Sequence, residues 1–164
     1  MHSVKALVIN TSPLLALFAA LDDLTVLKPL FACVIVPFEV AEELRKGGRF
    51  GFGVERFEAE SWLEKRETAT TLSPFMVEML DPGEAAVISL ALAEGIANVC
   101  IDDLKGRRLA RLAGLRLVGS LGLLLAAKQA GATIRLRDAV DRMRQRNIWL
   151  SESLVRNVLT QAGE

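Results

Sequence analysis

The sequence predicts a three-layer α/β/α domain built on a central, mainly parallel sheet. Short apolar runs alternate with longer segments that have helical spacing, which is the pattern of repeated β-α-β units. The 164 residues, 51% of them hydrophobic, are enough for one domain with a full core. Because no linker or repeat divides the chain, we expect residues 1–164 to form one domain, with the helices from about residue 135 packed on it.

Four apolar runs are predicted to be the strands of this sheet. They are short, rich in Val, Ile and Leu, and bounded by polar residues, Gly or Pro, as expected of strands buried on both faces. The four runs are residues 4–9, 31–36, 98–101 and 115–119.

Helices are predicted between these strands and after the last one. Ser12 is typical of an N-cap and Pro13 of a first helical position, and Asp81 and Pro82 repeat that pair further along the chain. Residues 47–53, rich in Gly and Phe, are predicted to end one helix and form a loop. Besides the helix that begins at Ser12, helical spacing is found in residues 37–46, 54–65, 73–80, 81–95, 103–114, 120–131, 135–147 and 151–163.

The residue inventory excludes several kinds of catalysis. His2 is the only histidine, which argues against Ser-His-Asp, Cys-His and His-metal chemistry. Cys33 and Cys100 lie in apolar runs without a CxxC motif, so we expect reduced, buried thiols. No signal peptide and no run of ~18 apolar residues is present, so we expect a cytoplasmic protein that does not span a membrane.

The net charge of zero hides an uneven distribution of charges. Residues 1–100 contain 8 Lys and Arg against 14 Asp and Glu, whereas residues 101–164 contain 12 against 6. This distribution is typical of a cation site beside a phosphate-binding surface. It is equally typical of an Arg-rich face that pairs with an acidic partner or with a second copy of the chain.

Polar residues follow the predicted strands where those strands end. Because ligands of open parallel sheets bind outside the carboxyl ends of the strands, we expect these side chains to gather at one edge. The residues in question are Asn10, Thr11, Ser12, Glu43, Glu84, Asp102, Asp103 and Ser120.

Most of the acidic residues also have a structural interpretation. Asp81 and Glu84 have the D-x-x-E spacing of a capping box, and Asp102 and Asp103 are placed to cap the next helix. Glu43 falls on the border of the apolar stripe of its helix, from which it can lean into a cleft. Glu39 and Glu42, by contrast, are expected on a solvated face.

A hard cation would explain carboxylates and amides gathered without His or Cys. Mg²⁺ and Mn²⁺ prefer oxygen ligands, and they bridge to substrate phosphates. Lys105, Arg107, Arg108 and Arg111 would then hold a nucleic-acid backbone, or they merely solvate one face of a helix.

Five segments in order resemble PIN-domain proteins, and in particular a prokaryotic subfamily related to the VapC ribonuclease toxins. They are VINTSPLLAL, VIVPFEVAEEL, DPGEAAVISLALAEG, IDDLKGRRLA and VGSLGLLLAAKQAG, and the similarity extends over roughly residues 4 to 160. The resemblance implies a Rossmann-like fold, a Mg²⁺- or Mn²⁺-dependent endoribonuclease acting on single-stranded RNA, and a homodimer. It also implies a co-encoded antitoxin that binds at or over the acidic cleft.

The same resemblance implies roles for individual residues. The metal and catalytic positions fall on Asn10, Glu43, Glu84 and Asp103, with Asp102 as an auxiliary catalytic candidate. The residues expected to contact RNA are Thr11, Ser12, Lys105, Arg107, Arg108 and Ser120.

Asn10 departs from the family pattern, in which an aspartate is usual. An amide oxygen can coordinate a cation, but it brings no charge and cannot act as a base toward water. Two interpretations therefore stay open: a toxin ribonuclease weakened at this position, and a catalytically inactive PIN-fold module that binds RNA or protein. A phosphatase or nucleotide-binding protein fits poorly, because the chain has no GxxxxGK[ST] motif and no GxGxxG after a strand.

Overall fold

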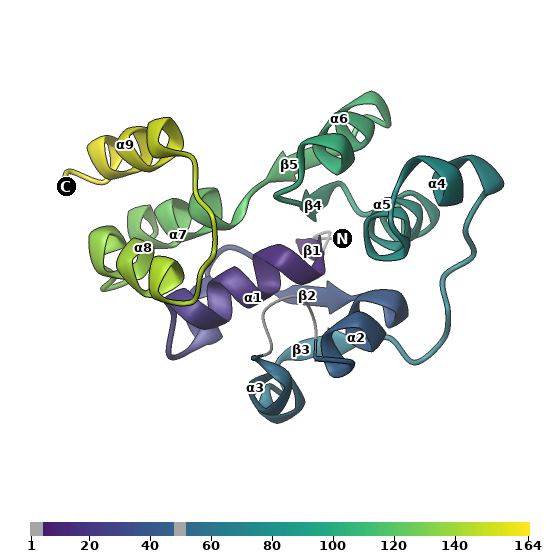
Figure 1. Cartoon of the computed structure of the whole chain (residues 1–164), viewed down its shortest axis with the longest axis horizontal. Helices are drawn as coiled ribbons and strands as arrows, with labels where there is room; N and C mark the ends of the chain where they lie inside the picture. Colours follow the sequence, from purple (N-terminus) through teal and green to yellow (C-terminus); the bar gives the residue numbers. More distant parts are fainter. Residues whose placement is uncertain (1–4, 48–51) are drawn as a thin grey trace.

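The computed structural model describes residues 5–47 and 52–164 of the chain. Within them a five-stranded, all-parallel sheet is flanked by helices, which confirms the predicted α/β fold (Figure 1). The strands are β1 (Ala6–Ile9), β2 (Cys33–Val36), β3 (Leu63–Lys65), β4 (Asn98–Cys100) and β5 (Arg116–Val118).

The order of the strands creates a crevice at the centre of the sheet. The order is β3-β2-β1-β4-β5, so the chain moves to one side of β1 first and to the other side after β3. Since crossovers between parallel strands are right-handed, α1 (Thr11–Ala20) and α5 (Pro82–Glu94) lie on opposite faces. Ligands of such sheets bind where the direction reverses, which here is between the carboxyl ends of β1 and β4.

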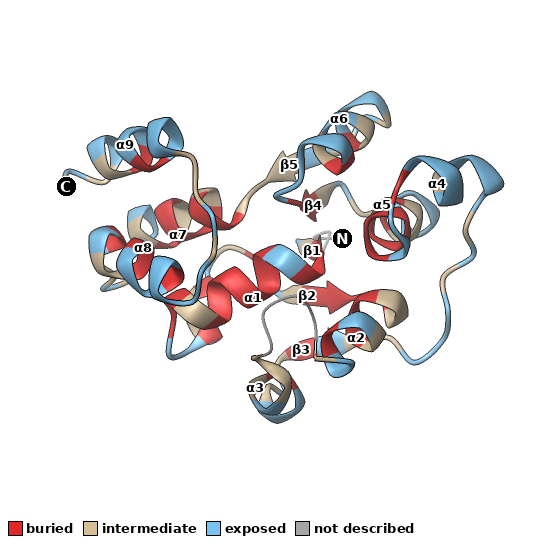
Figure 2. Ribbon diagram, viewed as in Figure 1, coloured by how far each residue is buried: buried red, intermediate tan, exposed pale blue. Residues whose placement is uncertain are grey.

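The core is formed by the central strands and by α1. The residues of β1 from Leu7 to Ile9 are fully buried, and so are Leu14 and Leu17 of α1 (Figure 2). A helix that is apolar on all sides is stable only inside a protein, and α1 meets this condition by packing against α2, α7 and α8.

The remaining helices surround this core. The C-terminal helices pack on the same body, α8 against α1 and α9 against both α7 and α8. Their bounds are α2 (Phe38–Arg45), α3 (Val54–Ala59), α4 (Pro74–Met79), α6 (Leu104–Leu112), α7 (Ser120–Gln129), α8 (Leu136–Gln145) and α9 (Glu152–Gln161), and a 3₁₀ turn, η1, covers Leu24–Leu27. No helix in the described part of the chain is long and apolar enough to cross a membrane.

The start of α1 differs from the sequence prediction. The N-cap is Asn10, whose side chain makes no capping hydrogen bond, and the helix begins at Thr11. Ser12 and Pro13 therefore lie inside the first turn. Proline is tolerated there because the first backbone N–H groups of a helix have no intrahelical partner.

The segment predicted to be helical over residues 54–65 is only partly so. The helix α3 ends at Ala59, and Leu63–Lys65 forms the edge strand β3, which the sequence prediction missed. The Cys33 thiol, predicted to be buried, is half-buried and donates a hydrogen bond to Glu64 Oε2 of this strand at 2.8 Å.

Glu39 does not lie on a solvated face as predicted. Its carboxylate accepts hydrogen bonds from the Thr70 backbone N–H at 2.6 Å and from the Thr70 hydroxyl at 2.9 Å. These bonds fasten the segment between β3 and α4. Part of the predicted Gly- and Phe-rich loop, residues 48–51, lies outside the described residues, as does His2.

Candidate functional site

The predicted metal positions lie at one edge of the sheet, next to the crevice between β1 and β4. Asn10 follows β1 directly, and its backbone N–H donates to the Cys100 carbonyl oxygen at the end of β4 at 3.1 Å. Asp103 lies three residues after Cys100 and is the N-cap of α6. Glu43 comes from α2 and Glu84 from the first turn of α5, and these two helices pack against each other.

Gly83 shows how closely Asn10 and Glu43 approach α5. An alanine Cβ at this position would lie 3.0 Å from Asn10 Oδ1 and 3.2 Å from Glu43 Oε2, so both oxygens lie against the bare backbone. Asn10 is only 6% exposed, and its Oδ1 atom is buried without a hydrogen-bond partner in the part of the chain that the structure describes. A buried oxygen without a partner costs free energy, which a bound ligand would recover.

Glu43 is held in place by the residue after Asn10. The hydroxyl of Thr11 donates to Glu43 Oε2 at 2.8 Å. The Glu43 side chain is exposed to solvent, whereas Thr11 is buried. The hydrogen bond therefore orients a solvent-accessible carboxylate toward the end of β1.

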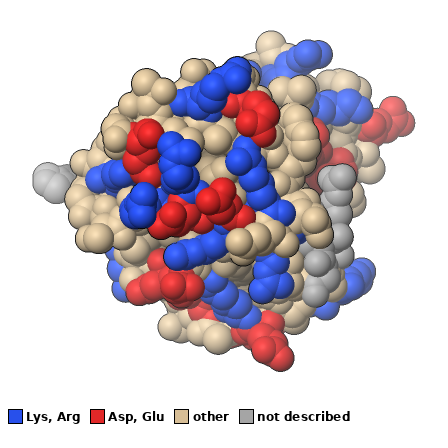
Figure 3. Space-filling model, turned by 60° about the vertical axis from the view of Figure 1, so that its left-hand side comes forward, with Lys and Arg blue, Asp and Glu red and all other residues tan. Residues whose placement is uncertain are grey.

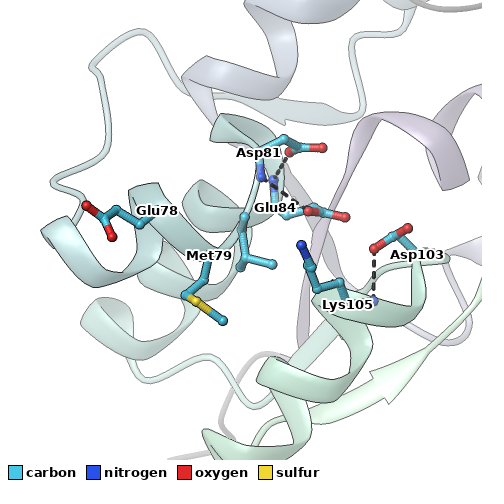
Figure 4. A pocket seen from close by; sticks show the side chains of 7 residues that line it. Glu78, Met79, Asp81, Glu84, Asp103 and Lys105 are labelled. Carbon is cyan, nitrogen blue, oxygen red and sulfur yellow. Dashed lines mark hydrogen bonds between the residues drawn. The ribbon is translucent and has the colours of Figure 1, made fainter.

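Glu84 forms the predicted capping box with Asp81. Its backbone N–H donates to Asp81 Oδ1 at 2.8 Å, and the Asp81 N–H donates back to Glu84 Oε2 at 3.4 Å (Figure 4). Glu84 is also 5% exposed, which is unusual for a carboxyl group that only caps a helix. Burial, reinforced by the nearby charges of Asp81 and Asp103, raises the pKa of Glu84 to about 7.

Glu84 opens into a pocket of about 400 Å³ between α4, α5 and α6. Figure 4 shows the carboxyl groups of Asp81 and Glu84 turned to the same side, with Asp103 facing them and Glu78 pointing away. The lining residues are Glu78, Met79, Leu80, Asp81, Glu84, Asp103 and Lys105.

Asp103 caps α6 and faces Glu84 across a glycine. Its Oδ1 accepts hydrogen bonds from the backbone N–H groups of Lys105 at 2.9 Å and Gly106 at 3.3 Å. An alanine Cβ at Gly106 would lie 3.3 Å from Glu84 Oε1 and 2.9 Å from Ile101 Cγ2. The missing side chain lets α6 approach the Glu84 carboxyl group.

Asp102 has a different environment. It accepts hydrogen bonds from the backbone N–H and the hydroxyl of Ser120, at 2.9 and 2.8 Å. Arg107 of α6 donates to the Ile101 carbonyl oxygen at 2.7 Å. These bonds give Asp102, Ser120 and Arg107 structural partners and connect the ends of β4 and β5.

The other residues predicted to contact RNA lie in different places. Ser12 and Lys105 are exposed, and Lys105 lines the acidic pocket. Arg108 is exposed in a separate hollow on α6, together with Leu104, Arg111 and Leu112. Thr11 is buried beneath Glu43.

On the face that Figure 3 presents, the basic half of the sequence does not produce an unbroken positive surface. Figure 3 shows Lys and Arg mixed with Asp and Glu over the face that it presents. Within the C-terminal part, Lys128 pairs with Glu164 at 2.7 Å and Arg144 pairs with Glu152 at 2.7 Å.

The ligand atoms available at this edge of the sheet are of the type that hard divalent cations prefer. All are oxygens, and one of them, Asn10 Oδ1, is buried and unpartnered. Among the described residues, however, no three His, Cys, Asp or Glu side chains lie close enough together to hold a metal ion. A metal on the β1 side of the edge would therefore need the neutral amide oxygen as one of its ligands.

Asp81 lies at this edge although it was not among the predicted site residues. An alanine Cβ at Gly83 would lie 3.5 Å from Asp81 Oδ1, beside Asn10 Oδ1 and Glu43 Oε2. In the sequence Asp81 is fully accounted for as an N-cap, so no signal there indicated a second role.

Comparison with known proteins identifies a family for the chain. No curated protein and no solved structure gives a significant match to the chain. A family model described as the PIN domain matches residues 6–164, a range that includes all five strands and every predicted site residue. The chain therefore belongs to the PIN-domain family.

Proposed function

We propose that this chain is a Mg²⁺- or Mn²⁺-dependent endoribonuclease that cleaves single-stranded RNA, and that it is weakened by Asn10. PIN domains have a nuclease-type fold and generally use divalent metal ions. The observation that carries the proposal is the gathering of Glu43, Glu84, Asp103 and the unpartnered Asn10 oxygen at one edge of the sheet. Separate segments of the chain supply these four groups, and the fold brings them to the position where α/β proteins bind ligands.

Asn10, Glu43, Glu84 and Asp103 are the residues that would hold the ion, and the three carboxylates would have to move closer together to do so, because no three acidic side chains of the described residues already meet. When bound, a divalent metal supplies Lewis acidity toward the phosphate and lowers the pKa of a coordinated water. The chain's own groups do the positioning: Thr11 orients Glu43, and the backbone of α6 fixes Asp103. Lys105 lines the same pocket, and it would contact the RNA backbone.

The neutral side chain of Asn10 is expected to weaken metal binding. Replacing a carboxylate at ~4 Å from the ion by an amide removes a charge–charge attraction of roughly 1–4 kcal/mol. Burial of Glu84 adds to the cost, because its carboxyl group must lose a proton before it can bind a metal. Slow cleavage at millimolar metal is therefore the expected behaviour.

The test is cleavage of single-stranded RNA by the purified chain with Mg²⁺ or Mn²⁺, compared with the Asp103→Asn variant. Asparagine caps a helix as well as aspartate does, so this change removes the charge while it keeps the start of α6. We expect cleavage by the wild type and a loss of at least about tenfold in the variant. Asp138→Asn, in the first turn of α8, is the matched control.

Absence of metal-dependent cleavage by the wild type with both ions would contradict the proposal. It would favour the second candidate, a catalytically inactive PIN-fold module that binds RNA or protein. The neutral Asn10 and the lack of three converging acidic side chains among the described residues are the observations that favour this candidate.

Asn10→Asp distinguishes the two functions. If the native site is an impaired nuclease site, we expect the restored carboxylate to increase both metal affinity and cleavage by about tenfold or more. If the variant binds RNA but still cleaves nothing, the binding module is the better account.

We further propose a cytoplasmic homodimer that acts as the toxin of a toxin–antitoxin pair. Large apolar side chains are exposed on α4, which lines the acidic pocket, and on α6, which supports burial of these surfaces by a protein partner. They are Phe75, Val77, Met79, Leu104 and Leu112. Light scattering of the purified chain tests the dimer, and co-purification with the product of an adjacent short gene tests the antitoxin.

A further inference from the structure

We propose that Asp81 is a ligand of the divalent cation and supplies the negative charge that Asn10 lacks. This inference rests on the proposed metal dependence, and it assigns a second role to a residue that otherwise only caps α5. The site consists of Asn10 Oδ1, Glu43 Oε2 and the Asp81 carboxylate, arranged around the bare backbone of Gly83.

The geometry around Gly83 brings these three groups together. An alanine Cβ there would lie 3.0 Å from Asn10 Oδ1, 3.2 Å from Glu43 Oε2 and 3.5 Å from Asp81 Oδ1. The groups come from the end of β1, from α2 and from the N-cap of α5. Three oxygens from three separate elements therefore lie within 3.5 Å of one position against the Gly83 backbone, close enough to one another to share an ion beside it.

The buried amide oxygen indicates that a ligand binds beside these three groups. Asn10 is 6% exposed, and its Oδ1 atom has no hydrogen-bond donor among the described residues. A neutral donor would satisfy the amide but would leave the two carboxylates beside it repelling each other. A cation satisfies all three oxygens at once, and hard divalent ions prefer such ligands.

The charges also match a divalent ion. Glu43 and Asp81 together carry two negative charges, which is the number that neutralises Mg²⁺ or Mn²⁺. The positive end of α5 opposes cation binding, but its effect corresponds to only about half a charge and Asp81 already caps it.

Asp81 is fixed in an orientation that suits this role. Its Oδ1 accepts the Glu84 N–H at 2.8 Å, so the helix sets the direction of the carboxyl group. Asp81 is exposed, and a carboxylate oxygen can accept more than one partner, so Oδ1 can accept the capping bond and still bind the ion. Figure 4 shows this carboxyl group on the same side as that of Glu84.

Asp81→Asn separates capping from metal binding. Asparagine and aspartate are equally good N-caps, so the variant is expected to unfold at the wild-type urea midpoint in the absence of metal. Mn²⁺ binding, measured by isothermal titration calorimetry, is expected to weaken by about tenfold to several-hundredfold because one charge is lost.

Two further variants complete the test. Glu78→Gln removes an equal charge from the same pocket, but Glu78 points away from the site, so we expect nearly wild-type Mn²⁺ affinity (Figure 4). The double variant Asn10→Asp/Asp81→Asn has its carboxylate at position 10 instead of position 81. If Asp81 compensates for Asn10, this variant is expected to recover most of the Mn²⁺ affinity that Asp81→Asn loses.

The outcomes separate this inference from the proposed function. Equal Mn²⁺ affinity of wild type and Asp81→Asn would overturn the role of Asp81 and leave the metal-dependent nuclease standing. An equal loss in Glu78→Gln would also overturn it, because the effect would then be a general one of charge. If the wild type binds no Mn²⁺ at all, both the inference and the proposed function fail.

Discussion

Asp102 binds Ser120 through both of its carboxylate oxygens. Oδ1 accepts the Ser120 backbone N–H at 2.9 Å, and Oδ2 accepts its hydroxyl at 2.8 Å. The two residues are 18 positions apart, one after β4 and the other at the start of α7. Their contact closes the end of the sheet beside Asp103, the N-cap of α6.

Ser120→Ala is expected to destabilise the chain by about 1 kcal/mol. The change removes the hydroxyl bond but leaves the backbone bond to Asp102, and a single hydrogen bond contributes roughly this much. Urea unfolding measures the effect. Ser61→Ala, at an exposed position, is the control and should stay within about 0.5 kcal/mol of wild type. Unchanged stability of Ser120→Ala would show that the contact does not hold this end of the sheet.

Thr11→Val tests the orientation of Glu43. Valine has nearly the same shape as threonine but cannot donate to Glu43 Oε2, so the carboxylate loses its fixed position. We expect a loss of about 1–2 kcal/mol in the free energy of unfolding and weaker Mn²⁺ binding, measured by urea titration and calorimetry.

Thr11→Ser retains the hydroxyl and is the matched control. It should bind Mn²⁺ like the wild type, because the hydrogen bond to Glu43 can form again. If Thr11→Val also binds Mn²⁺ like the wild type, the hydroxyl does not position a metal ligand.

The central part of the fold was predictable because its signals are local and strong. The strand before Asn10 is a continuous apolar run, and the start of α5 has both a capping aspartate and a proline. The alternation of strands and helices then determines which strand ends meet at one edge. For this reason the residues of a candidate site could be predicted from the sequence.

The features that the sequence did not predict depend on contacts between distant segments. The strand β3 has only three residues, which is too short to show an alternation of apolar and polar side chains. It is recognisable only through its pairing with β2. Glu39 and Thr70 are 31 residues apart, and no local pattern indicates that they bind each other. The placement of Asp81 beside Asn10 likewise follows from the packing of α5 against the end of β1.

Gly83→Ala is expected to weaken Mn²⁺ binding with little effect on stability. The added methyl group would lie 3.0 Å from Asn10 Oδ1 and 3.2 Å from Glu43 Oε2, so these oxygens must move apart. The higher helix propensity of alanine, about 1 kcal/mol, offsets the strain in the free energy of unfolding.

Gly122→Ala is the control for this change. Gly122 is also helical, and its added methyl group would meet only Val118 Cγ2, at 3.1 Å, away from the acidic residues. Calorimetry should therefore show a loss of Mn²⁺ affinity in Gly83→Ala alone. Equal affinities in the two variants would mean that the oxygens around Gly83 do not bind the ion.

The hydrogen bonds of Glu164 make the stability of the C-terminal helices depend on pH. Burial alone would raise the pKa of this carboxyl group, but the hydrogen bonds from Lys128 and from the backbone of Arg137 and Leu136 lower it to about 2. Because the folded-state pKa lies below the ordinary value of 4.5, the stabilisation is complete above pH 4.5. It is lost as the pH falls toward 2, where the carboxylate is protonated in the folded state as well.

Glu164→Gln is therefore expected to lower the free energy of unfolding at pH 7 by about 1–2 kcal/mol, less than full linkage would give because the side chain is partly solvated. Urea unfolding at pH 7, 5 and 3 measures the difference from wild type. It should be largest at pH 7, nearly as large at pH 5 and much smaller at pH 3. Glu67→Gln, at an exposed position, controls for the loss of one charge. A difference for Glu164→Gln that is the same at all three values would mean that the carboxylate charge does not anchor α8.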